Sequence, residues 1–155
     1  MNAKRINQWL TLGANLGVLI GIILLLVELH QNSTMMRTQT RYEVSQGIVD
    51  LLSLSANNDQ LVSVLRRADS GEELTPDEQM QFRHRTFALF RYLENLHYQY
   101  RQGLFDEAEY STQRLAWTAY LNSSKAAVTA WCILRPSVSP EFRSEINSKL
   151  NTYTC

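Results

Sequence analysis

The stretch from Leu10 to Leu29 constrains this chain more than any other, because its only charged residue is Glu28, next to its end. A helix of that length spans roughly 30 Å at about 1.5 Å per residue, which matches the hydrocarbon core of a bilayer. The stretch is mostly Leu, Ile, Val and Gly and has no polar face, unlike an amphipathic helix of a soluble core. Trp9 lies at its amino-terminal edge, where an indole favours lipid headgroups. The sequence therefore predicts a transmembrane helix.

A cleaved signal peptide is the main alternative to this prediction, and a buried core helix is the second. Lys4 and Arg5 give the charged start that a signal peptide has. The residues at 27–32 contain no small-residue cleavage pattern, and the apolar run is longer than that of a usual signal. We therefore expect residues 1–30 to be a tail and an uncleaved anchor, and residues 31–155 to form one helical bundle domain.

Three glycines recur every four residues inside the predicted anchor, at Gly13, Gly17 and Gly21. This spacing places them on one stripe of a helix, where the absence of side chains lets a second backbone approach closely. We expect this stripe to be a packing face for a second copy of the chain or for another membrane helix. The alternative is that glycine is simply frequent in membrane helices.

The remainder of the chain has the sequence signals of helices and none of a strand. Thr75-Pro76-Asp77-Glu78 is typical of a helix start, with a cap, a proline in the first turn and a glutamate three residues after the cap. Apolar spacing, caps and breaks predict helices at 34–56, 60–68, 76–102, 107–121, 124–134 and 140–150. Short connections favour antiparallel neighbours. The expected fold is all-α, with a single N-terminal transmembrane helix followed by a compact antiparallel helical bundle.

The charge of the predicted domain argues against a nucleic-acid surface. Without Lys4, Arg5 and Glu28, 13 of the 15 basic and 14 of the 15 acidic residues remain, and the arginines are scattered. Nucleic-acid binding would need an excess of Lys and Arg on one face. The two cysteines, Cys132 and Cys155, form no C-x-x-C pair for zinc. We expect a buried thiol at 132 and a free thiol at 155, and a bridge only in an oxidising compartment.

No complete catalytic or metal site is present in the sequence. Glu94 and His97 have the Glu-x-x-His spacing of a di-iron ligand pair, because residues three apart project from one side of a helix. Such a site needs a second pair, and neither His30 nor His84 has a glutamate three residues before it. There is no G-x-S-x-G, phosphate-loop or G-x-G-x-x-G motif. We therefore expect no enzyme activity, no cofactor and no metal.

A polar face on the predicted helix at 76–102 is the strongest candidate for a site in the domain. Its members follow helical spacing, and aromatic residues surround them. They are His84, Arg91, Glu94, Asn95, Tyr98, Gln99 and Gln102. If the face is solvated or paired within the fold, its role is structural. If it points into the bundle, it is a candidate surface for a ligand or a partner.

Parts of the sequence resemble a widespread group of uncharacterised bacterial membrane-anchored helical proteins. The segments are Phe-Arg-Tyr-Leu-Glu-Asn at 90–95, Tyr-Gln-Tyr-Arg-Gln-Gly-Leu-Phe-Asp at 98–106, and Ser-Pro-Glu-Phe at 139–142. The resemblance implies an amino-terminal hydrophobic helix, an all-helical fold and an inner-membrane location, and it brings no activity with it. The residues that it singles out, for folding or for function, are Arg91, Glu94, Asn95 and Gln99.

Together these features predict a membrane-anchored helical interaction or accessory module that acts through the glycine stripe, the bundle surface or both. Its expected partners are the lipid bilayer and either a second copy or a component of a membrane complex, and not nucleic acid. The alternative is a tethered bundle that binds or senses a small ligand near Arg91 and Asn95. Lys4 and Arg5 lie closer to the anchor than Arg37 does on its other side, so the positive-inside rule favours a periplasmic domain.

Overall fold

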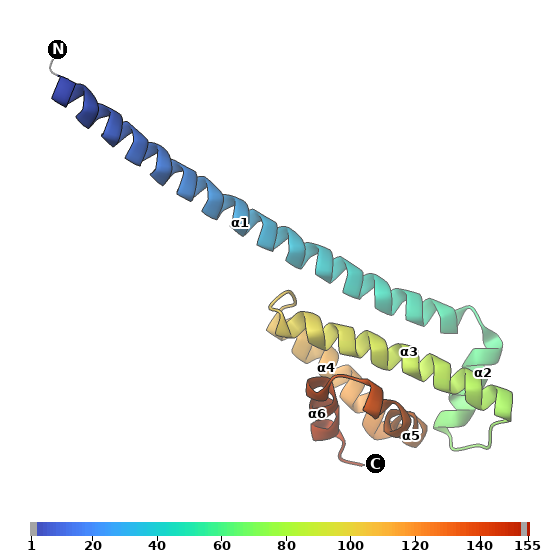
Figure 1. Cartoon of the computed structure of the whole chain (residues 1–155). Coiled ribbons are helices and arrows are strands. Elements are labelled where there is room, and N and C mark those ends of the chain that lie inside the picture. Colours follow the sequence, from blue (N-terminus) through green and yellow to red (C-terminus); the bar gives the residue numbers. More distant parts are fainter. Residues whose placement is uncertain (1–2, 153–154) are drawn as a thin grey trace. The chain divides into compact units, whose positions relative to one another are not determined.

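The computed structural model describes residues 3–152 and residue 155. Every regular element in this part of the chain is a helix (Figure 1). The elements are α1 (Ala3–Ala56), α2 (Asp59–Asp69), α3 (Pro76–Arg101), α4 (Glu107–Ser123), α5 (Lys125–Leu134), the short 3-10 helix η1 (Arg135–Ser137) and α6 (Pro140–Lys149). The expected all-α class is confirmed, and the predicted ends of α2 to α6 lie within two residues of the observed ones. The antiparallel arrangement stays a prediction.

The chain divides into two units by its internal contacts, one up to Gln39 and one from Thr40 to Cys155. We call them the N-terminal segment and the domain. The sequence placed this boundary at residue 30, where the apolar run ends. The contacts divide the chain after Gln39, and Thr40 is the first buried residue, whereas the end of the anchor at residue 30 stays a prediction.

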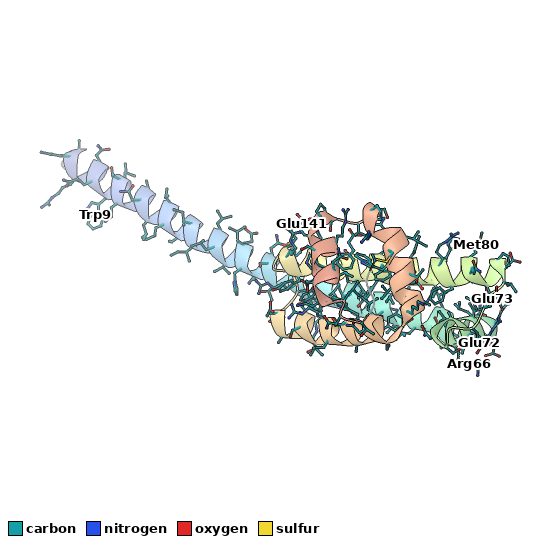
Figure 2. All side chains as sticks on the ribbon, turned by 90° about the horizontal axis from the view of Figure 1, so that it is seen from below. Trp9, Arg66, Glu72, Glu73, Met80 and Glu141 are labelled. Atoms are coloured by element: carbon teal, nitrogen blue, oxygen red, sulfur yellow. A yellow bond between two sulfur atoms is a disulfide. The ribbon has the colours of Figure 1, made fainter. Side chains whose placement is uncertain are left out.

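α1 continues from the N-terminal segment into the domain as one helix, so the residues between the predicted anchor and the predicted helix at 34–56 are helical as well. Its most apolar window of 18 residues has a mean hydropathy of 2.5, and none of that window is buried. Trp9 lies exposed on the same segment (Figure 2). The hydroxyl of Thr11 donates to the carbonyl oxygen of Asn7 at 2.9 Å, so it is satisfied within its own helix. By length and composition, this helix is a candidate membrane span or signal sequence.

Side-chain caps set the ends of the domain's helices. At the start of α3, the Glu78 N–H donates to Thr75 Oγ1 at 3.3 Å, and the Thr75 N–H donates to Glu78 Oε2 at 2.8 Å. At the start of α4, Asp106 Oδ1 accepts from the Ala108 N–H at 2.8 Å. α3 ends before Gly103, whose φ of 70° lies in the region that favours glycine. These caps are local in sequence, which is why the pattern of residues predicts them well.

The core of the domain forms around α3, which contacts α2, α4, α5 and α6 (Figure 1). Trp131 of α5 is fully buried, and its ring centroid lies 5.1 Å from that of Phe90 and 5.8 Å from that of Phe142. Its indole N–H donates to Asn147 Oδ1 at 3.0 Å. A second cluster packs Val44 of α1 against α3 and α4. The end of α1 is therefore part of the domain's core.

Candidate functional site

The residues of the predicted polar face on α3 separate into small groups. Five of them are exposed, namely His84, Arg91, Asn95, Tyr98 and Gln102. Glu94 and Gln99 are partly buried. The structure brings Arg91 together with Glu94, and it brings Gln99 Nε2 to 3.5 Å from Asn95 Oδ1. It leaves His84, Tyr98 and Gln102 on the surface.

Arg91 and Glu94 fasten α3 to the segment that leads into α6. Arg91 Nη1 lies 2.6 Å from Glu94 Oε2, and Arg91 Nη2 donates to the Ser137 carbonyl oxygen at 3.0 Å. The Ser139 N–H donates to Glu94 Oε1 at 2.7 Å. Ser139 also caps α6, because its Oγ accepts from the Phe142 N–H at 3.4 Å. The Arg91–Glu94 pair therefore holds the start of α6 against α3, which is a structural role.

The surroundings of Glu94 favour its charged form. Partial burial raises the pKa of the carboxyl group, but the hydrogen bonds from the Ser139 N–H and from Arg91 outweigh burial and hold the pKa below its usual value of 4.5. The unfolded chain thus binds this proton at a higher pH than the folded chain. The charged Glu94 stabilises the domain above the unfolded pKa, and this contribution is lost as the pH falls through the folded pKa.

Glu94→Gln is expected to lower the free energy of unfolding by about 1 kcal/mol or more near pH 7, because the amide has one acceptor oxygen for two donors and has lost the charge that strengthens both contacts. The deficit should shrink below the folded pKa, where the wild-type carboxyl group is itself neutral. Urea unfolding of the full chain in detergent micelles, followed by circular dichroism from about pH 7 to about pH 3, measures both effects.

Asp50→Asn is the matched control for Glu94→Gln. Asp50 is an exposed carboxylate whose Oδ1 accepts from Gln46 Nε2 at 3.1 Å, a bond that an amide oxygen can also accept. Its substitution should change the stability by less than about 0.5 kcal/mol. A deficit in Glu94→Gln that stayed constant from neutral to acidic pH would contradict the assigned role of the charge.

His97 is held by packing between aromatic rings. Its ring is buried, and its centroid lies 6.1 Å from that of Tyr110 and 5.7 Å from that of Phe142. Burial lowers the pKa of the imidazole below its usual value, although the Glu145 carboxylate acts in the opposite direction. Glu94, its neighbour in the Glu-x-x-His pattern, bonds to the start of α6. Among the described residues, no group of three or more His, Cys, Asp or Glu could hold a metal ion.

An aromatic and charged cluster lies next to His97 and was missed by the sequence analysis. Tyr100 stacks on Tyr110, with ring centroids 4.2 Å apart. The Arg114 guanidinium lies 5.6 Å over the Tyr110 ring, and its Nη1 is 3.6 Å from Glu145 Oε1. Burial, together with the Glu145 carboxylate, raises the pKa of the Tyr110 hydroxyl above its usual value. These side chains come from α3, α4 and α6, so no local spacing in the sequence could have revealed them.

Two hollows of the domain bring charged and apolar side chains together. A groove of about 370 Å³ is lined by α1 and α4, and Arg41 pairs there with Glu109 at 2.7 Å. A smaller pocket of about 220 Å³ is lined by α1, α2, α3 and α4 and includes Arg85. Arg85 could not be distinguished from the sequence alone, because nothing within one helix indicates that four helices meet around it.

Cys132 and Cys155 form a disulfide, which corrects the expectation of two unpaired thiols. Their Cα atoms lie 5.5 Å apart, a normal separation for a bridged pair. Cys132 is also only partly buried on α5, and not fully buried as expected. The 23 positions that separate the two cysteines include α6, whose course is set by tertiary packing, so the sequence alone could not bring them together.

The glycine stripe of the N-terminal segment is open on all sides. A Cβ atom added at Gly13, Gly17 or Gly21 would meet no atom within 4 Å. Gly47 of the domain differs, because a Cβ atom there would lie 3.3 Å from the Tyr92 ring. The stripe therefore has room for a second helix, and its role stays a prediction.

The chain matches none of the protein-family models, curated proteins or solved structures with which it was compared. The Arg91–Glu94 pair fastens α6, and the cluster around His97 is packed within the domain. The pocket at Arg85 differs from both, because it is a hollow with a charged donor on its wall.

Proposed function

We propose that this chain is a single-pass protein of a bacterial inner membrane, in which residues 10–29 anchor a helical domain that binds other membrane proteins or a second copy of itself. The observation that carries this proposal is the exposed helix with a mean hydropathy of 2.5 over 18 residues. Exposed apolar surface on that scale is unfavourable in water, whereas the hydrocarbon core of a bilayer covers it.

The anchor is retained in this proposal and not cleaved as a signal peptide. The apolar run is followed by glutamate, histidine and amide residues, whereas signal cleavage requires small residues. α1 also continues to Ala56, and its later turns place Val44 and Leu51 in the buried core of the domain. One helix thus supplies both the anchor and part of the core, which supports a chain that works uncleaved.

Two independent features support a domain on the periplasmic side. Lys4 and Arg5 lie closer to the apolar run than Arg37 does, which favours a cytoplasmic amino terminus. The second feature is the disulfide between Cys132 and Cys155, because disulfides persist in oxidising compartments and are rare in the cytosol.

An interaction or accessory role, without catalysis or a metal, fits the surface of the domain. Large apolar side chains are exposed on several of its helices, for example at Met80, Leu115 and Ile133. These side chains supply contact area for a partner, while the paired polar groups of α3 fasten the fold. The segments at 90–95 and 98–106 support membership of the group of membrane-anchored helical proteins that they resemble.

Gly17→Ile is expected to weaken self-association of the anchor at least about fivefold, because an isoleucine in the middle of the stripe keeps a second backbone away. Energy transfer between donor- and acceptor-labelled full chains in lipid vesicles, measured against dilution with lipid, gives the dissociation constant. Val18→Ile, one residue off the stripe, is the matched control and should leave the constant unchanged. Equal constants for Gly17→Ile and the wild type would remove the stripe from the proposal.

A further inference from the structure

The pocket of about 220 Å³ between α1, α2, α3 and α4 has the walls of a small-molecule site. Its apolar lining is Ile48, Leu52, Leu65 and Leu89. Its volume exceeds the roughly 150 Å³ of an apolar cavity that holds benzene. A single ring or a short aliphatic chain would therefore fit against this wall, with room for a polar head.

Arg85 supplies a positive charge to this pocket, and only some of its N–H donors make hydrogen bonds within the described part of the chain. Its Nε–H donates to Ser55 Oγ at 2.9 Å, which holds the guanidinium in place. Within the described part of the chain, its two Nη atoms have no hydrogen bond or ion pair. Burial lowers the pKa of this guanidinium below its usual value. A partly desolvated guanidinium with free N–H groups is suited to donate two parallel hydrogen bonds to a carboxylate.

Thr86, the next residue on α3, adds a second donor to the same pocket. The residue is 2 % exposed, and its hydroxyl has no hydrogen-bond partner among the residues that the structure describes. Among the described residues, the fully buried side-chain atoms without a partner do not include this hydroxyl, so it keeps some contact with solvent. An acceptor atom bound in the pocket would satisfy this hydroxyl.

Two other polar residues on the wall indicate where an anion would lie. Asp69 Oδ1 accepts from the Ser124 hydroxyl, so this carboxylate already has a donor. Burial and Asp69 raise the pKa of the Tyr120 hydroxyl, and Arg85 acts in the opposite direction, so Tyr120 lies within the field of both charges. Because Asp69 repels a second carboxylate, the anionic head of a ligand belongs at the Arg85 end of the pocket.

We propose that this pocket binds a small organic carboxylate, whose anionic head pairs with Arg85 and Thr86 and whose apolar body packs against Leu65 and Leu89. The site is formed by different residues from the polar face of Arg91 and Asn95. The proposal concerns the domain alone and does not depend on the partner that the anchored chain binds.

The test uses the full chain in nanodiscs of zwitterionic phosphatidylcholine, with 4-fluorobenzoate as the probe. Broadening of the fluorine NMR signal during titration gives the dissociation constant, and empty nanodiscs correct for partition into lipid. We expect a dissociation constant of about 1 mM or below. The neutral isostere 4-fluorobenzamide should bind at least about tenfold more weakly, because it lacks the charge that pairs with Arg85.

Three variants separate the pocket from the rest of the domain. Arg85→Gln should weaken binding of 4-fluorobenzoate at least about tenfold, whereas Arg83→Gln, which removes an exposed charge from the same helix, should not change it. Leu52→Trp should also abolish binding, because Leu52 is largely exposed at the pocket and a larger side chain there can fill it without disturbing the core. Circular dichroism of each variant checks that the domain is folded.

Each outcome decides the proposal. Binding that is lost in Arg85→Gln and Leu52→Trp, kept in Arg83→Gln and weaker for the benzamide supports it. The proposal is overturned if the wild type binds no 4-fluorobenzoate at about 5 mM, far above the expected dissociation constant. It is equally overturned if folded Arg85→Gln binds as tightly as the wild type, or if the acid and the amide bind alike.

Discussion

Two arginines in the apolar segment, Leu19→Arg together with Ile23→Arg, should release the chain from the membrane. Each arginine near the middle of a membrane helix costs about 2.5–3.5 kcal/mol on insertion scales, so the pair costs about 5–7 kcal/mol. That is comparable with the whole favourable insertion energy of residues 10–29, which contain thirteen Leu, Ile and Val residues at about 0.5 kcal/mol each. We expect most of the variant, but little of the wild type, to be extracted from membranes by alkaline carbonate.

Leu19→Val with Ile23→Val is the matched control, because it changes the same positions and keeps them apolar. It should remain with the membranes as the wild type does. Flotation of the pellet in a density gradient separates membrane-bound chains from aggregates. If the double-arginine variant floated with the lipid in the same proportion as the wild type, the apolar segment would not be what holds the chain to the membrane.

Trp131→Ala is the second large expected effect, and it concerns the domain. The side chain is fully buried between Phe90 and Phe142, and truncation removes both its packing and its hydrogen bond to Asn147. Replacing a buried aromatic residue by alanine typically costs about 3–5 kcal/mol. Most domains are stable by only about 5–15 kcal/mol, so this loss removes a large part of the total.

Urea unfolding of the full chain in micelles, followed by circular dichroism, measures this loss as a shift of the domain's transition. Ile133→Ala is the matched control, because Ile133 lies on the same helix and is 59 % exposed. It should shift the transition by less than about 0.5 kcal/mol. Similar shifts for the two variants would contradict the placement of Trp131 at the centre of the core.

The elements of this fold were predictable because their signals are local. The capping box of Thr75 and Glu78, the Asp106 cap and Gly103 each act within a few residues, and they fix the ends of α3 and α4. The pairing of Arg91 with Glu94 was predictable for the same reason, since residues three apart on a helix are neighbours.

The candidate sites were less predictable because they depend on contacts between distant residues. Glu94 accepts its second hydrogen bond from the Ser139 N–H, which lies 45 positions later in the chain. This bond holds the start of α6 against α3, and no spacing within α3 predicts it. Cys132 meets Cys155 only because the chain returns after α6. Arg85 is one of several arginines on α3, and only the meeting of four helices distinguishes it from Arg83.

In the proposed function, an uncleaved anchor holds the domain on the oxidising side of the membrane. A membrane-impermeant maleimide, applied to intact bacterial spheroplasts that make the full chain, tests it through Cys132 and Cys155. These two cysteines are the only ones in the chain, and they form the disulfide, so labelling should require reduction. Cys132→Ser with Cys155→Ser is the matched control and should never be labelled.

We predict no labelling of intact spheroplasts before treatment with a membrane-impermeant reductant, and labelling of two thiols after it, on a full-length chain in the membrane fraction. That result requires the domain to lie outside the cytoplasm with its disulfide formed. Labelling that needs lysis of the spheroplasts but no reductant would contradict the account, because it would place reduced thiols, and hence the domain, in the cytoplasm.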